Sequence, residues 1–220
     1  MSERWATFDC YGTLIDWNGG LWTEFATVWP EADTDRLLEL YHLIEPHIEE
    51  HGDLTYDEVL VRALAATGAI EGLSVPIGRE HALAESLPSW PPFPEVPGAL
   101  AGLRSRGWKL GVLSNTDPDL LTPSVESIGV PFDVAITAKE AGSYKPAPGH
   151  WESFFAETGA DRARHVHVGA SLFHDIEAAA RMGMRAVWIN RLDETSDVPR
   201  TAELPDLTRL PDTLDEIQAD

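Results

Sequence analysis

The sequence is poor in the features that mark secreted, membrane-spanning or nucleic-acid-binding proteins. A single cysteine, Cys10, excludes an intramolecular disulfide, and there is no run of about 18 apolar residues, the length that a transmembrane helix requires. Only 16 basic residues stand against 37 acidic ones, and the resulting net charge of −21 repels nucleic acids and anionic membranes. The first residues, MSERWATFD, lack the basic and then apolar order of a signal peptide. We therefore expect a cytoplasmic protein that binds neither nucleic acid nor membrane.

Hydrophobic residues make up 43% of the chain, enough for a packed core, and their arrangement after residue 97 indicates an α/β fold. Short apolar segments alternate there with amphipathic helical patterns. Candidate strands cover residues 5–9, 109–113, 132–137, 166–169 and 185–189. Because alternating strands and helices form parallel sheets that helices cover on both faces, we predict a Rossmann-like, doubly wound parallel sheet.

A segment of different character separates the first strand from the rest. Residues 37–44 repeat apolar side chains with helical spacing, and we expect Pro46 to end or kink this helix. Thr55 and Glu58 have the spacing of a capping box, which opens a second helix. A proline-dense stretch then returns the chain to the α/β region. The predicted organisation is a Rossmann-like core of residues 1–15 and 94–220 with a helical cap of residues 16–93 inserted into it.

Polar residues follow the predicted strands at the edge of the sheet where ligands bind in such folds. In an open parallel sheet this edge lies at the carboxyl ends of the strands. The residues there are Asp9 after the first strand, Ser114 and Asn115 after the second, Lys145 beyond the third, and Asp175 after the fourth. A carboxylate, a hydroxyl with an amide, an ammonium group and a second carboxylate therefore converge on one edge, as expected of an active site.

The segments that carry these residues resemble the four sequence motifs of the haloacid dehalogenase superfamily. FDCYGT contains Asp9, SN is Ser114–Asn115, YKP contains Lys145, and VGASLFHD ends in Asp175. The resemblance is greatest to the L-2-haloacid dehalogenase branch. It implies a hydrolase in which Asp9 attacks the substrate and forms an ester, while Lys145 holds Asp9 and balances charge. It also implies that Asp175 orients Lys145 or helps to activate water, and that Ser114 offers a further catalytic donor.

The expected substrate-binding residues come from both parts of the chain. They are Tyr11, Thr13, Asn115, Ser171 and His174 in the core, and Tyr41, His42 and Glu45 in the cap. Enzymes of the resembling branch carry a cap arginine that receives the substrate carboxylate and the departing halide. This chain has Leu40 to His42 at that place, and Arg36 lies a full turn earlier. Leu172 stands where those enzymes carry an asparagine, so we expect an unusual haloacid or a different electrophile.

A phosphatase of the same superfamily is the alternative. Phosphatases of this kind carry a second aspartate two residues after the nucleophile, where this chain has Tyr11, and a magnesium-binding aspartate where it has Ala170. We therefore expect no metal and no cofactor, with magnesium required only by the phosphatase alternative. A small molecule is the expected partner. Whether the protein forms a homodimer is left open. A protein of this fold that has another substrate or no activity is also left open as an alternative.

Overall fold

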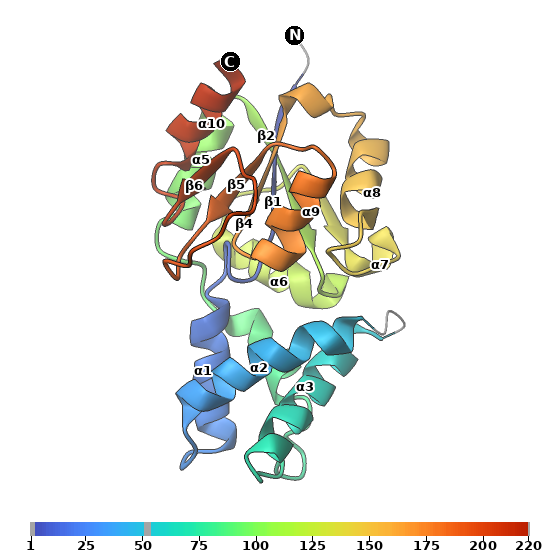
Figure 1. Cartoon of the computed structure of the whole chain (residues 1–220), viewed down its shortest axis with the longest axis vertical. Helices are drawn as coiled ribbons and strands as arrows, with labels where there is room; N and C mark the ends of the chain where they lie inside the picture. The colour runs from blue at the N-terminus through green and yellow to red at the C-terminus, as the bar shows by residue number, and fades with distance from the viewer. Residues whose placement is uncertain (1–2, 51–53, 220) are drawn as a thin grey trace.

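The computed structural model describes residues 3–50 and 54–219 and contains a six-stranded parallel sheet (Figure 1). The strands are β1 (Arg4–Phe8), β2 (Trp108–Ser114), β3 (Val134–Thr137), β4 (His165–Gly169), β5 (Ala186–Ile189) and β6 (Ala202–Leu204). Their order across the sheet is β3-β2-β1-β4-β5-β6, which confirms the predicted Rossmann-like, doubly wound fold. The sequence does not predict β6, because its 3 residues are too few to show an alternating pattern.

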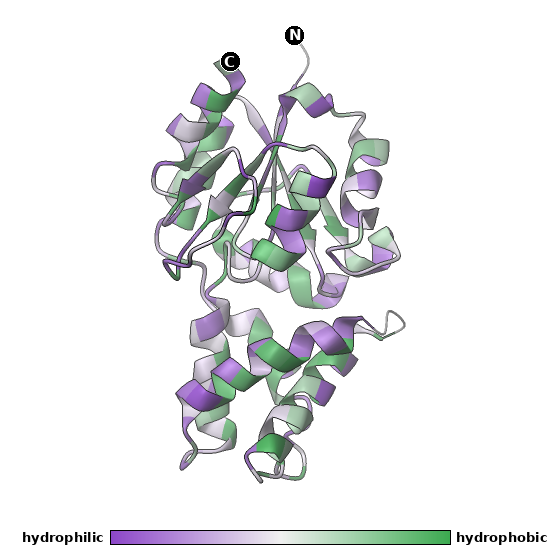
Figure 2. Ribbon diagram, viewed as in Figure 1, coloured by the Kyte–Doolittle hydropathy of each residue, from purple (hydrophilic) through white to green (hydrophobic). Residues whose placement is uncertain are grey.

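Helices cover both faces of this sheet. They are α5 (Val96–Ser105), α6 (Pro118–Ile128), α7 (Ala138–Ala141), α8 (Gly149–Thr158), α9 (Glu177–Arg181) and α10 (Leu210–Ala219), with the short turns η2 (Arg162–Arg164) and η3 (Leu172–Ile176) on either side of β4. Side chains of β1 alternate between the faces, since Phe8 shares a buried cluster with Leu100 of α5 whereas Trp5 packs on Phe154 of α8. Figure 2 shows mostly hydrophobic central strands, as expected for strands buried on both faces.

The remaining helices lie beyond the carboxyl ends of the strands (Figure 1). They are α1 (Trp17–Val28), α2 (Thr34–Glu49), α3 (Tyr56–Ile70) and α4 (Ala82–Ser86), followed by the turn η1 (Leu87–Ser89). Thr55 and Glu58 form the predicted capping box at the start of α3. Of the two outcomes expected at Pro46, an end or a kink, the helix end is wrong, because α2 continues to Glu49. None of the helices described for this chain has the length and apolar character that a membrane crossing requires.

Two chain segments, residues 14–16 and 91–93, connect these helices with the sheet and run side by side. Backbone hydrogen bonds of 2.9 and 3.0 Å and one antiparallel bridge join them. Hydrophobic packing is continuous through this connection, because Leu14 belongs to the same buried cluster as Trp17 and Trp90. The helices α1–α4 are therefore packed onto the end of the sheet as well as tethered to it.

Gly20, inside α1, tests this packing. A Cβ atom at Gly20 would overlap the indole ring of Trp90. Gly20→Ala should therefore lower the free energy of unfolding by about 1–3 kcal/mol in urea titrations, although alanine has the better helix propensity by about 1 kcal/mol. Gly98→Ala in α5 is the control, because a Cβ there meets no atom within 4 Å and the change should be neutral or stabilising. Equal effects at the two glycines would contradict the close packing of α1 on Trp90.

Candidate active site

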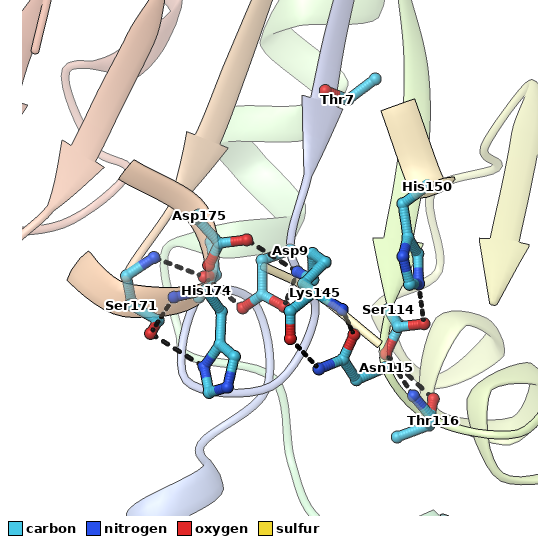
Figure 3. A network of polar contacts seen from close by, with 12 residues as sticks. Thr7, Asp9, Ser114, Asn115, Thr116, Lys145, His150, Ser171, His174 and Asp175 are labelled. Carbon is cyan, nitrogen blue, oxygen red and sulfur yellow. Dashed lines mark hydrogen bonds and ion pairs between the residues drawn. The ribbon is translucent and has the colours of Figure 1, made fainter. Parts of the chain in front are cut away.

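A buried ammonium group joins two carboxylates at the carboxyl end of the sheet (Figure 3). Asp9 follows β1, Asp175 lies in η3 beyond β4, and Lys145 lies in the loop between α7 and α8. Lys145 Nζ donates to Asp9 Oδ1 at 2.9 Å and to Asp175 Oδ1 at 2.7 Å. Lys145 is 2% exposed, and Asp175 is fully buried. The structure thus brings together three of the expected catalytic residues, Asp9, Lys145 and Asp175.

The close contact sets the charges of these groups. Burial alone would lower the pKa of Lys145, but Asp175 and Asp9 raise it above its usual range, so the lysine stays protonated. Burial alone would raise the pKa of Asp175, but Lys145 and His167 hold it below its usual range. Burial raises the pKa of Asp9, Lys145 opposes the rise, and Asp175 adds to it. Lys145 is therefore a fixed positive charge at this site rather than a proton acceptor.

The turn after β1 holds the second oxygen of Asp9. Thr13 Oγ1 donates to Asp9 Oδ2 at 2.7 Å, and the backbone N–H of Ala170 donates to Thr13 Oγ1 at 2.9 Å. Both oxygens of Asp9 thus accept a hydrogen bond, which fixes the orientation of the carboxylate. The side chain of Ala170 offers no oxygen ligand. Within residues 3–50 and 54–219, no group of three or more His, Cys, Asp or Glu residues is arranged to hold a metal ion.

Three residues of β1 and β4 support Asp175 from within the sheet. His167 Nε2 lies 3.2 Å from Asp175 Oδ1, and His167 Nδ1 is bonded to Thr7 Oγ1 at 2.9 Å. Gly169 leaves the space that Asp175 needs, because a Cβ there would lie 2.6 Å from the Asp175 Cβ. Thr7, His167 and Gly169 are not among the residues expected at the site. The available signal was the alternation of His165 and His167 on one face of the strand.

Ser114, the last residue of β2, and Asn115, which follows it, make different contacts. Asn115 Oδ1 accepts from the Lys145 N–H at 2.7 Å, and Asn115 Nδ2 donates to the Lys145 carbonyl at 3.2 Å. The Ser114 hydroxyl is bonded to Thr116 Oγ1 at 2.9 Å, and the Ser114 carbonyl accepts from His150 Nε2 at 2.9 Å. The structure therefore ties Asn115 to the backbone of Lys145, and the Ser114 hydroxyl to its own loop.

Tyr11, Ser171 and His174 complete the expected core residues. The Tyr11 hydroxyl is bonded to Ser124 Oγ at 2.9 Å and donates to the Leu120 carbonyl at 3.2 Å, so α6 holds it. Ser171 begins η3, where its Oγ accepts from the His174 N–H at 3.1 Å and lies 3.0 Å from His174 Nδ1. Ser171 therefore orients the imidazole of His174 and leaves Nε2 for a partner from α2.

That partner is Glu49, the acid at the end of α2. Its two carboxylate oxygens accept from Asn115 Nδ2 at 3.2 and 3.1 Å, and Oε2 lies 3.2 Å from His174 Nε2. Glu49 is 5% exposed. Burial alone would lower the pKa of His174, but Glu49 raises it. Glu49 is not among the residues expected at the site, although it lies one helical turn after Glu45, because Pro46 is expected to end or kink the helix before it.

Tyr41 and His42, two of the residues expected to bind substrate from the cap, make their contacts between α2 and α1. Tyr41 is fully buried, and its ring centroid lies 6.0 Å from that of Trp17 and 5.8 Å from that of Phe25. His42 Nε2 is bonded to Asn18 Oδ1 at 2.9 Å. These contacts assign both residues to the packing of α2 on α1.

Arg36, which lies a full turn before the place of the expected cap arginine, is paired with two glutamates. Its guanidinium group pairs with Glu39 at 3.1 Å and with Glu71 at 3.4 Å, and its side chain is 47% exposed. Leu40 and Tyr41, where those enzymes carry the arginine, are buried. The contact that α2 makes with the polar edge of the sheet is therefore through the carboxylate of Glu49.

A pocket of about 430 Å³ opens beside these residues. It is lined by Pro46 and Glu49 of α2, by Tyr144 and Lys145 of the loop after α7, and by Phe173 of η3. A volume of this size holds a small organic molecule. Since Lys145 and Glu49 both border the pocket, it adjoins the polar edge of the sheet.

Comparison with known proteins confirms the resemblance seen in the motifs. The sequence model of the haloacid dehalogenase-like hydrolases matches residues 4–183. The chain is similar to haloacetate dehalogenase H-2 of Moraxella sp. (strain B), with 29% identity over 213 residues and 91% of each chain covered. It is also similar to the crystal structure of an L-2-haloacid dehalogenase, with a TM-score of 0.86, 25% identity, and coverage of 98% of this chain and 100% of the other. A glyceraldehyde 3-phosphate phosphatase of Methanothermobacter thermautotrophicus matches only 45% of each chain, at 33% identity.

Glu45 gives this site a measurable pH dependence. Burial raises the pKa of Glu45 to about 8, the neighbouring Glu49 adds to the rise, and the hydrogen bond from Tyr56 opposes it. Between about pH 5 and about pH 8 the folded chain keeps a proton that the unfolded chain has lost, so stability should fall as pH rises, by at most about 1.4 kcal/mol per pH unit. Glu45→Gln should remove this loss in urea titrations across that range. Glu39→Gln, on the exposed side of α2, is the control, and parallel profiles for wild type and Glu45→Gln would refute the shift.

Proposed function

Because the chain belongs to the haloacid dehalogenase-like hydrolase family, we propose that this hydrolase removes halide from a small 2-haloacid or a related halogenated compound, with Asp9 as the nucleophile. The observation that carries the proposal is the ammonium group of Lys145 between Asp9 and Asp175. The ammonium group holds the carboxylate of Asp9 in a fixed orientation at the sheet edge. The similarity of the chain to a haloacetate dehalogenase over 91% of its length supports the same reaction.

In the first step a carboxylate oxygen of Asp9 attacks the carbon that carries the halogen. A carbon–oxygen bond forms, the carbon–halogen bond breaks, and its electron pair leaves with the halide. Lys145 and Thr13 hold the two oxygens of Asp9, so little orientational freedom is lost when the substrate arrives. The product of this step is an ester on Asp9.

In the second step water attacks the carbonyl carbon of that ester. Lys145 stabilises the negative charge that develops on the carbonyl oxygen. The ester bond then breaks, the hydroxylated product leaves with one proton of the water, and the other proton goes to solvent. Asp175 Oδ2 is buried and has no hydrogen-bond partner among the described residues, and we assign it the role of orienting the attacking water.

We further propose that residues 16–93 act as a cap on a core of residues 1–15 and 94–220. Asp117 Oδ2 accepts from the Tyr56 N–H at 2.8 Å, and the Tyr144 hydroxyl donates to the Leu54 carbonyl at 2.8 Å. With the bonds of Glu49, these contacts close the cap helices over the strand ends. Closure excludes bulk water from the charged groups, which strengthens their interaction with the substrate.

The phosphatase alternative is the weaker one. Burial raises the pKa of the Tyr11 hydroxyl above its usual range, and α6 holds that hydroxyl, so Tyr11 is a poor proton donor to a leaving oxygen. Ala170 offers no ligand to magnesium. The proposed dehalogenation requires neither a proton donor at position 11 nor a magnesium ligand at position 170.

Oxygen isotope transfer tests the nucleophile. A single turnover of 2-chloropropionate in H₂¹⁸O should leave the product unlabelled and place one ¹⁸O in the carboxylate of Asp9, because water attacks the ester of Asp9 and not the substrate. Mass spectrometry of the peptide that contains Asp9 measures this. Asp9→Asn should abolish chloride release. Label appearing in the product of the first turnover, with an active Asp9→Asn variant, would exclude the proposed mechanism.

Metal removal separates the two candidate reactions. Chloride release should be unchanged by excess EDTA, and p-nitrophenyl phosphate should react barely above the uncatalysed rate, because the residues at 11 and 170 lack the carboxylates that a magnesium-dependent phosphatase uses. The matched variant is Ala170→Asp, measured with and without added magnesium. Phosphatase activity of the wild-type protein that magnesium restores after chelation would favour the alternative.

A further inference from the structure

Glu49 of α2 meets two nitrogen groups at the polar edge of the core. Asn115 Nδ2 donates a hydrogen bond to Glu49 Oε2 at 3.1 Å, and His174 Nε2 lies 3.2 Å from the same oxygen, at ion-pair distance but without a hydrogen bond. A substrate anion in this region needs such donors. It would have to displace a carboxylate that is only 5% exposed and that belongs to the cap itself.

The positive charges around this edge are already matched by carboxylates. Lys145 is shared between Asp9 and Asp175. Arg191 Nη2, which donates to the carbonyl of Thr13, lies 2.7 Å from Glu95 Oε1. His174, when protonated, faces Glu49. An added carboxylate would therefore raise the local excess of negative charge rather than complete an ion pair.

We propose that Glu49 is a specificity-determining residue of this site, and that it selects a small 2-halogenated primary amide over the corresponding 2-haloacid. The inference rests on the proposed function and names its substrate class. A primary amide has one acceptor oxygen and two N–H donors, whereas a carboxylate has acceptors alone. Inserted between Asn115 and Glu49, the amide oxygen accepts from Asn115 Nδ2 and the amide N–H donates to Glu49.

This exchange replaces the bifurcated hydrogen bond from Asn115 Nδ2 to the two oxygens of Glu49 by one hydrogen bond from Asn115 and one to Glu49. The halogenated carbon is bonded to the amide carbon, and Asn115 lies beside Lys145, with which it shares two hydrogen bonds. A carboxylate of the same shape would place its oxygens against the oxygens of Glu49. Sites built to pair a polar group discriminate strongly against a ligand that leaves it unpaired.

Binding of unreactive isosteres tests the selectivity apart from the chemistry. In 2-methylpropionamide and 2-methylpropionate a methyl group stands for the halogen, so neither compound can react with Asp9. By titration calorimetry with the wild-type protein the amide should bind about tenfold tighter than the acid or more. Glu49→Gln should reduce that ratio about tenfold, because a glutamine amide can donate to a carboxylate. Glu39→Gln removes the same charge from the exposed side of α2 and should leave the ratio unchanged.

The outcomes separate this inference from the proposed function. Equal binding of the two isosteres, tighter binding of the acid, no binding of the amide, or an unchanged ratio in a folded Glu49→Gln variant would overturn it. Chloride release from 2-chloropropionamide and 2-chloropropionate should show the same preference in kcat/KM. If the amide binds more tightly but no ¹⁸O is transferred to Asp9, the proposed mechanism is refuted and the role of Glu49 is retained. If ¹⁸O is transferred to Asp9 but the amide is not preferred, the role of Glu49 alone is refuted.

Discussion

The interaction of Lys145 with Asp9 and Asp175 is the constraint around which the core is arranged. Two carboxylates at the end of a sheet, both withdrawn from water, repel each other, and each costs several kcal/mol to bury without a partner. The single ammonium group offsets this cost only if its position is fixed. Asn115 fixes the backbone of Lys145 through both its N–H and its carbonyl, and Gly169 provides the space for Asp175. The conformations of the loops that follow β2, β3 and β4 therefore serve to hold the Lys145 ammonium group between the two carboxylates.

The contacts between the cap helices and the core are of two kinds. Near residues 14–16 and 91–93 they are apolar and continuous with the main core, which holds the two parts together. At the far end hydrogen bonds accompany the contact between the Tyr56 and Tyr144 rings, and one of these bonds places the carboxylate of Asp117 at the N-terminus of α3, where the helix dipole favours a negative charge. Hydrogen bonds of this kind can be exchanged for bonds to water at little net cost. An apolar joint with a polar rim suits a cap that opens at the rim and stays attached at the joint.

The sheet and its catalytic edge were predictable because they depend on local patterns. Alternating apolar segments indicate the strands, and parallel strands bring their carboxyl ends to one edge, which is why Asp9, Lys145 and Asp175 could be named together. The cap face was not predictable in the same way. Helical periodicity puts Tyr41 on the apolar stripe of α2, but only the packing on Trp17 and Phe25 decides that its ring belongs to the cap interior. Glu49 was missed because a proline ends many helices and tertiary contacts decide whether one continues.

The position of Glu49 runs against the local rules of helix stability. It lies in the last turn of α2, where the negative end of the helix dipole disfavours an acid and favours lysine or arginine. It is also buried, and it lies one turn from Glu45 on the same helix, where it adds to the rise in the pKa of Glu45. Asn115 and His174 recover part of this cost, but an uncharged polar side chain could accept from Asn115 without it. A buried acid that breaks a local rule of helix stability where the helix meets the polar edge of the sheet is expected at a functional site.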